Sequence, residues 1–149
     1  MGTKQNNHQQ KLDRFKAICK AKGIKLTPQR LIIYEELIKT DEHPSTEMLY
    51  QKIRKKFPTI SVDTVNRTLL TFHKIGVAGL VEGSGNPKRF DGNLNKHHHV
   101  ECVKCKKIVD FYNDVYNNLP IPQEIQDNFR ILRQTVRIEG ICKTCSQEA

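Results

Sequence analysis

The chain has no tryptophan, and none of its apolar runs approaches the roughly 20 residues that a membrane-spanning helix needs. Its first ten residues, MGTKQNNHQQ, lack the apolar core of a secretory signal peptide. The lack of a long apolar run argues against a membrane-bound protein, and the lack of a signal peptide argues against a secreted one. We therefore expect a soluble, cytoplasmic protein that has no membrane partner.

Acidic side chains are scarce in the first two-thirds of the chain. Residues 1–96 hold 18 Lys and Arg against nine Asp and Glu, whereas residues 97–149 hold seven of each sign. A basic segment followed by a neutral one suggests a polyanion-binding domain joined to a second part of different character. The alternative is an ordinary solvated basic surface. We expect two domains, residues 1–91 and 92–149, each so small that a metal or dimerisation would help to stabilise it.

Four of the five cysteines form two Cys-x-x-Cys pairs, Cys102 with Cys105 and Cys142 with Cys145. In a chain without a secretion signal such pairs favour zinc over disulfides, because the cytosol keeps thiols reduced. Four thiolates also match the tetrahedral donor set of structural zinc. The alternative is a thioredoxin-type redox protein, which needs one pair, not two, at a helix start. Cys19 lies in a helical apolar pattern and is expected to be buried.

Capping residues and apolar spacing predict short helices followed by a hairpin. After a disordered start, the predicted helices cover 10–22, 26–40, 45–56 and 61–75, and the hairpin covers 77–91 with its turn at 84–87. This order on a basic chain is typical of a winged helix-turn-helix domain. After a hinge at 92–96, strands at 97–102 and 107–111 and a helix leading into a strand at 124–140 predict a small α/β domain. The fold class is therefore α+β.

The helix over 61–75 is expected to have a core face and a polar face. The core face is formed by apolar residues at helical spacing, Val62, Val65, Leu69 and Phe72. The polar face could enter a DNA major groove, where Asn66 and Arg67 can read base edges, while Lys55, Lys56, Lys88 and Arg89 suit phosphates; a plain solvent-exposed helix is the alternative. The expected DNA contacts are Thr64, Asn66, Arg67, Lys74, Lys55, Lys56, Lys88 and Arg89.

The chain is similar to the ferric uptake regulator family in the order and spacing of six motifs: KLTPQR, HPSTEMLY, FPTISVDTVNRTL, RFD, HHHVECVKCKKIVDF and GICKTC. The resemblance extends from about residue 12 to 145. It implies a metal-dependent bacterial repressor that is not an enzyme and that binds inverted-repeat double-stranded DNA as a homodimer. It also implies that the four paired cysteines hold one structural Zn²⁺ per subunit.

The consecutive histidines can be divided by strand geometry. In a strand over 97–102, His97 and His99 point to one side, while His98 and Cys102 point to the other. The histidine pair and the thiolate therefore favour two separate metal sites. His98 is expected to face solvent or a second ligand shell.

The resemblance supplies the remaining ligands of the histidine site. By position, His43, Asp91 and Asp110 join His97 and His99 around one regulatory metal per subunit, bound between the two domains. A mixed set of nitrogen and oxygen donors suits Fe²⁺ or Mn²⁺.

Aspartate at both 91 and 110 resembles the peroxide-responsive branch of the family, where iron-uptake regulators more often carry glutamate. In that branch, ferrous ion and hydrogen peroxide oxidise a ligating histidine, here His43 or His97, and the repressor is released. The alternative is an iron- or manganese-uptake regulator without peroxide sensing. The chain departs from the family at Asn66, where an aromatic residue is usual, and at RQTVRIEG, which lacks the histidine of an additional metal site.

Overall fold

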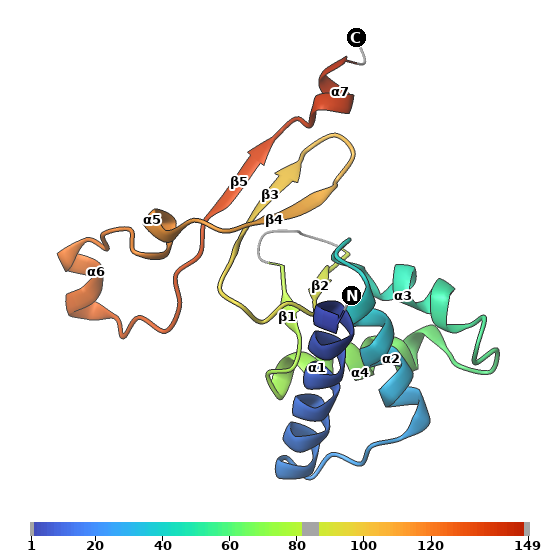
Figure 1. Ribbon diagram of the computed structural model, residues 1–149. Coiled ribbons are helices and arrows are strands. Elements are labelled where there is room, and N and C mark those ends of the chain that lie inside the picture. The colour runs from blue at the N-terminus through green and yellow to red at the C-terminus, as the bar shows by residue number, and fades with distance from the viewer. Residues whose placement is uncertain (1, 82–86, 148–149) are drawn as a thin grey trace. The chain divides into compact units, whose positions relative to one another are not determined.

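A computed structural model describes the backbone of residues 2–81 and 87–147, and the chain divides into two compact units, Met1–Leu94 and Asn95–Ala149 (Figure 1). Helices dominate the first unit and a sheet forms the centre of the second, so the α+β fold class is confirmed. Among the described residues, no helix has the length and apolarity that crossing a bilayer requires.

Four helices build most of the first unit: α1 (Gly2–Ala21), α2 (Pro28–Lys39), α3 (Thr46–Ile53) and α4 (Val62–Lys74). The side chains of Thr27, Ser45 and Ser61 cap α2, α3 and α4, each accepting a hydrogen bond from the backbone N–H three residues later. Gly23 and Gly76 follow α1 and α4 with φ of +69° and +84°, a left-handed conformation that ends a helix.

The predicted disordered start is wrong, because α1 begins at Gly2. The extra turns are polar, and Gln9 donates a side-chain hydrogen bond to Asp13 one turn later at 2.9 Å. Lysine and glutamine have good helix propensity, so they extend a helix that Phe15, fully buried, anchors to the core. The spacing of apolar residues predicted only the part of α1 that packs against the core, and so it missed the polar turns before residue 10.

The core of the first unit is centred on three aromatic rings from three helices. Phe15 stacks on Tyr34 with ring centroids 4.0 Å apart, and Phe72 meets Phe15 edge-on at 5.1 Å. Deleting such a ring costs about 3–5 kcal/mol. Of the predicted core face of α4, Val65, Leu69 and Phe72 are fully buried. Val62 is 43% exposed, so that part of the prediction is wrong: it lies in the first turn, where it lines an open groove beside α3.

A small hairpin completes the first unit. Strand β1 (Gly79–Leu80) pairs antiparallel with β2 (Phe90–Asp91), and Gly79 lies opposite Asp91. Most of the predicted turn, 84–86, lies outside the described residues. After β2 the chain passes close to α2: a Cβ on Gly92 would lie 3.2 Å from the Leu37 carbonyl oxygen. Only glycine fits this approach without displacing α2.

The second unit is a three-stranded sheet with three short helices (Figure 1). The central strand β3 (His98–Cys102) pairs antiparallel with β4 (Ile108–Phe111) and parallel with β5 (Arg137–Gly140). Helices α5 (Asp114–Asn117) and α6 (Gln123–Asn128) lie between β4 and β5, and α7 (Lys143–Gln147) follows β5. The helix predicted from residue 124 is therefore short, since Phe129 is already extended (φ −135°, ψ 140°).

Candidate metal centres and nucleic-acid interface

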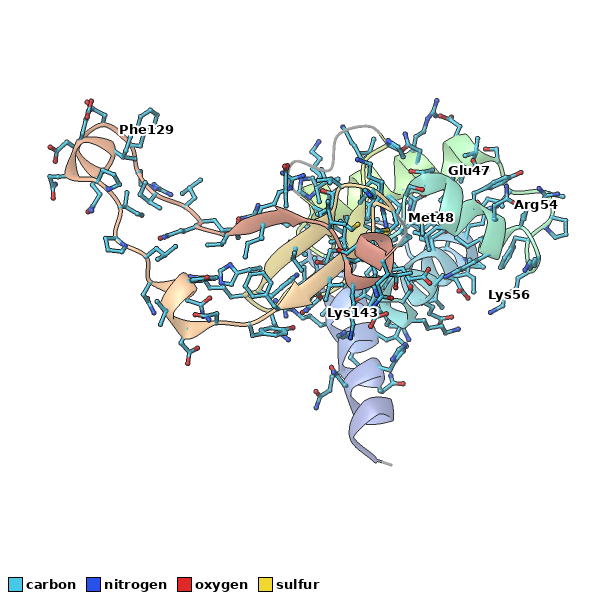
Figure 2. The ribbon with its side chains drawn as sticks, turned by 90° about the horizontal axis from the view of Figure 1, so that it is seen from above. Glu47, Met48, Arg54, Lys56, Phe129 and Lys143 are labelled. Atoms are coloured by element: carbon cyan, nitrogen blue, oxygen red, sulfur yellow. The ribbon has the colours of Figure 1, made fainter. Side chains whose placement is uncertain are left out.

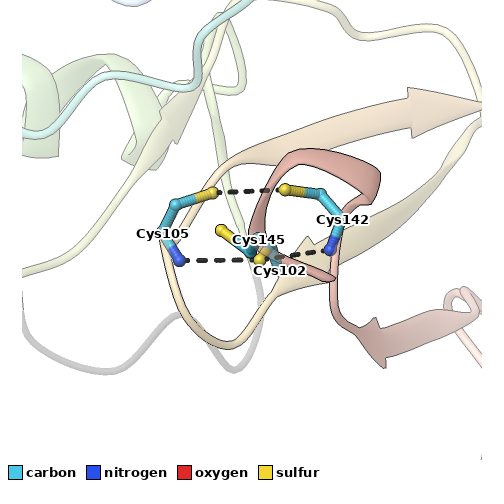
Figure 3. A group of neighbouring side chains, drawn as sticks. All are labelled: Cys102, Cys105, Cys142 and Cys145. Atoms are coloured by element: carbon cyan, nitrogen blue, oxygen red, sulfur yellow. Dashed lines mark hydrogen bonds between the residues drawn. The ribbon is translucent and has the colours of Figure 1, made fainter. Parts of the chain in front are cut away.

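The two Cys-x-x-Cys pairs meet in the second unit (Figure 3). Parallel pairing places Gly140 beside Cys102, so the chain leaving β5 delivers Cys142 next to the end of β3. Cys105 comes from the turn after β3, and Cys145 comes from α7. The four sulfur atoms all lie within 4.8 Å of one another. Tertiary pairing of β3 and β5 thus closes the 36-residue gap between the pairs.

Backbone amides prepare this cluster for a cation. The N–H groups of Cys142 and Cys105 donate to Cys102 Sγ at 3.4 and 3.5 Å, and they lower the pKa of Cys102 to about 6. A hydrogen bond with Cys142 is the main cause that raises the pKa of Cys145 to about 12. All five cysteines are free thiols. Four sulfurs of which one is readily ionised are the donor set of structural zinc, which displaces the remaining protons on binding.

Strand pairing also brings together His97, His99 and Asp110. His99 lies opposite Asp110 in the β3–β4 register. Asp110 Oδ1 is 3.3 Å from His97 Nε2 and 3.1 Å from His99 Nε2, and the two nitrogens are 3.1 Å apart. His97 Nδ1 donates to the backbone carbonyl of Asn95, which leaves the Nε2 lone pair for a metal. Two imidazoles and one carboxylate therefore converge on one point.

His98, the middle histidine, is fully buried, so of its two predicted positions the one facing solvent is wrong. Its Nε2 is 2.8 Å from Asn117 Oδ1, and its Nδ1 accepts the backbone N–H of Val136 at 3.0 Å. Phe111 and Tyr116 pack around the ring with centroids at 5.5 and 5.9 Å. Strand alternation placed this side chain on the face opposite His97 and His99, and α5 covers that face.

The other two predicted ligands lie in the first unit, in the loop before α3 and on β2. His43 Nε2 is 3.6 Å from Asp91 Oδ2, and both residues are buried. Asp91 Oδ1 accepts the backbone N–H of Asn93 at 2.8 Å. His43 has a left-handed backbone (φ +55°), which costs a non-glycine residue roughly 1–2 kcal/mol. A buried imidazole and carboxylate in contact are a second incomplete set of metal donors.

The polar face of α4 carries the expected base-reading side chains. Arg67 Nε lies 3.0 Å from Asp63 Oδ2 one turn earlier, and both side chains are exposed. Asn66 Oδ1 accepts a hydrogen bond from the Thr46 hydroxyl at 2.9 Å. Asn66 and Thr46 both line an open groove beside α3. The hydroxyl of Thr64 forms a hydrogen bond within the first turn of α4, 2.9 Å from the hydroxyl of Ser61.

The predicted phosphate contacts fall into two groups. Lys55, Lys56 and Lys88 are exposed, and Figure 2 shows Lys56, whose ammonium is 3.1 Å from Glu36. Lys74, expected on the polar face of α4, is exposed too. Arg89 instead turns its guanidinium onto the backbone carbonyls of Glu42 and His43.

Some residues that shape these sites carried no sequence signal. Thr46, which positions Asn66, lies 20 positions before it, and only the packing of α3 on α4 joins them. Arg137 on β5 donates to Glu101 on β3 at 2.7 Å and to Glu139 at 2.5 Å, and so ties the two parallel strands together. Neither pair has a spacing that a local pattern could reveal.

The helices and wing-like hairpin, the thiolate cluster and the two sets of imidazole and carboxylate donors together define a metal-binding winged-helix protein. Residues 21–139 match the sequence model of the ferric uptake regulator family, and the chain belongs to that family. The predicted family is confirmed, and the chain carries both donor sets that the predicted cofactors require: four thiolates for zinc, and imidazoles with carboxylates for a second metal.

Individual relatives show the same likeness. The peroxide-responsive repressor PerR of Staphylococcus epidermidis is 36% identical over 127 residues, covering 85% of this chain and 84% of that protein. The structure of the Helicobacter pylori ferric uptake regulator Fur superposes with a TM-score of 0.75 at 22% identity, covering 94% of each chain. The structure of PerR from Streptococcus pyogenes gives 0.52 at 25% identity, covering 90% of this chain and 92% of that one.

Proposed function

We propose that this protein is a homodimeric transcriptional repressor that binds inverted-repeat DNA when Fe²⁺ or Mn²⁺ is bound and that is released by hydrogen peroxide. The observation that carries the proposal is the use of aspartate in both donor sets, Asp91 beside His43 and Asp110 between His97 and His99. Similarity to relatives named as peroxide-responsive repressors supports the peroxide signal. The protein is a regulator in this proposal, not an enzyme.

The five side chains are proposed to share one ion. Three imidazoles and two carboxylates suit Fe²⁺ or Mn²⁺, whereas the four thiolates suit Zn²⁺. An ion that took ligands from both units would fix the angle between them, and in a two-fold dimer it would set the spacing of the two α4 helices against DNA. Couplings of about 1–3 kcal/mol between metal and DNA binding are typical of such linkage.

The proposed peroxide response is a net oxygen transfer onto an imidazole. Ferrous ion, when bound, would supply the redox chemistry that starts cleavage of the peroxide O–O bond, and overall the imidazole ring gives up the two electrons. One peroxide oxygen is added to the ring of His43 or His97, and the other leaves as water. The oxidised ring is a poorer nitrogen donor, so the remaining ligands hold the metal less tightly and the DNA-binding form is lost. Because His43 and His97 lie in different units, damage to either would release one unit from the ion.

A mobility-shift assay on an inverted-repeat probe tests this function, with Mn²⁺ or Fe²⁺ and with or without peroxide. We expect metal-dependent binding that peroxide abolishes only for the Fe²⁺ form, together with a one-oxygen mass increase on a peptide containing His43 or His97. Binding that needs metal but resists peroxide would leave an iron- or manganese-uptake regulator. Reversible disulfide turnover without bound zinc would point instead to a thiol-redox protein.

A further inference from the structure

The backbone at His43 adopts a conformation that its local sequence disfavours. Its φ is +55°, and the ring of Pro44 restricts the residue before it to extended geometry. The side chain is nevertheless well placed: it is 1% exposed, with Nε2 3.6 Å from Asp91 Oδ2. A contact from outside the His43–Pro44 dipeptide must hold the backbone in this state.

Arg89 makes that contact. Its Nη2 donates to the carbonyl oxygen of Glu42 at 2.7 Å, and its Nε donates to the carbonyl oxygen of His43. These two carbonyls belong to the peptide groups on either side of the His43 α-carbon. Because the orientations of those two peptide planes define φ and ψ, one guanidinium fixes the whole backbone conformation of His43.

The backbone at Arg89 and Phe90 strengthens this clamp. Ser45 pairs with Arg89 as an isolated antiparallel bridge, and the N–H of Phe90 donates to the Pro44 carbonyl at 2.9 Å. The loop that carries His43 is therefore attached to the hairpin strand that carries Asp91. Phe90 is fully buried, which anchors this strand in the core of the first unit.

We propose that Arg89 is a positioning residue for the regulatory metal, which preorganises His43 and joins it to β2, and that it is not primarily a phosphate contact. The inference rests on the proposed function, in which His43 and Asp91 are metal ligands. Arg89 directly precedes β2 and lies two residues before Asp91, so the clamp and the carboxylate move together. Metal binding at His43 then also restrains the hairpin at Lys88, the residue next to Arg89.

The effect of Arg89→Gln on Mn²⁺ affinity tests this role, because positioning and simple electrostatics predict opposite signs. Removing a positive charge near a cation site should tighten metal binding by Coulomb's law. Loss of the clamp should weaken it, by roughly tenfold or more if Arg89 acts like other residues that orient metal ligands. Isothermal titration calorimetry of the full-length, zinc-loaded protein measures both. Lys88→Gln is the matched control, since it makes the same charge change at an exposed neighbour and should not weaken binding.

A double-mutant cycle with His43→Ala identifies the route of the effect. If Arg89 acts through His43, Arg89→Gln should cost affinity in the wild-type background and almost none in the His43→Ala background. Equal costs in both backgrounds, or no cost in either, would overturn the inference. Arg89→Lys keeps the charge and one donor, so it should give an intermediate affinity, and it carries the test if Arg89→Gln fails to fold.

Two further measurements separate the competing explanations. A general folding defect would lower zinc content and the thermal midpoint together with Mn²⁺ affinity, whereas the clamp predicts that zinc content is unchanged. A phosphate contact would leave Mn²⁺ affinity intact and reduce the salt dependence of DNA binding by about one charge, which would contradict our proposal. If His43→Ala itself leaves Mn²⁺ affinity unchanged, the proposed metal site fails, and the inference fails with it.

Discussion

The imidazole of His98 bridges two segments of the second unit, with Nε2 2.8 Å from the side-chain oxygen of Asn117 and Nδ1 accepting the backbone N–H of Val136. His98→Ala would remove a fully buried ring and leave its two half-buried partners without this bond. A hydrogen bond contributes about 0.5–1.5 kcal/mol, so the two lost bonds should lower the free energy of unfolding by roughly 1–3 kcal/mol. Chemical denaturation of the zinc-loaded protein measures it.

The same substitution should leave the regulatory metal in place. His98 lies on the face of β3 opposite His97 and His99, so the number of Mn²⁺ ions bound per subunit should not change. Asn117→Ala is the matched control, because it removes only one of the two bonds and should cost less. Loss of Mn²⁺ binding in His98→Ala without loss of stability would show that His98 is a ligand.

Removing one thiol should release zinc. Cys105→Ser takes away one of four sulfur donors, and we expect loss of the bound zinc and a lower thermal midpoint, because structural zinc contributes folding free energy directly. Zinc content by mass spectrometry under native conditions checks this. Cys19→Ala is the control: Cys19 is buried in the first unit, so its loss should lower stability and leave zinc content unchanged.

Operator preference should depend on Asn66 and on the residue that orients it. With its oxygen held by Thr46, the amide of Asn66 presents N–H donors, which suit base acceptors such as guanine O6 and N7 or thymine O4. Asn66→Ala should reduce discrimination at one base pair of each half-site by about 1–3 kcal/mol. Thr46→Val should alter the preferred base with little effect on non-specific binding.

Selection of probes from a random DNA pool measures this change. Gln51→Ala is a suitable control on α3, since among the described residues the side chain of Gln51 bonds to Glu47 one turn earlier and to Arg54 at the end of the helix. An unchanged selected sequence for both Asn66→Ala and Thr46→Val would exclude this pair from base reading.

Dimerisation should bury the apolar side chains that follow α6. Leu132 is 81% exposed and Phe129 65% exposed in the single chain, and Figure 2 shows Phe129 projecting from this segment. Burying one leucine contributes about 1.5–3 kcal/mol, and two-fold symmetry counts it twice. Leu132→Asp should therefore give monomers in sedimentation experiments. Leu26→Asp, at a 39% exposed leucine of the first unit, should remain dimeric.

Local patterns predicted much of this protein, because three of its helices start at hydroxyl caps and its candidate ligands follow strand alternation. The hydroxyl caps Thr27, Ser45 and Ser61 indicated where three helices start. The opposite orientations of His97 and His98 followed from the alternation of side chains along a strand. What the patterns missed depends on partners distant in sequence. The burial of His98 requires α5 to cover it, and the inward turn of Arg89 requires the loop at Glu42 and His43. The polar turns at the start of α1 were missed because no apolar periodicity marks a helix segment that does not pack.

The close approach of Gly92 to α2 has a consequence for how the two sets of metal donors, one in each unit, could bind one ion. With Gly92 pressed against the Leu37 carbonyl and the Asn93 N–H bonded to Asp91, the free tether to His97 is only a few residues long. Six residues from Asp91 reach at most about 20 Å. In the proposed shared site, a metal held by His43 and Asp91 would therefore meet His97 and His99 at a high effective concentration, and their binding would be an intramolecular event with a small entropic cost.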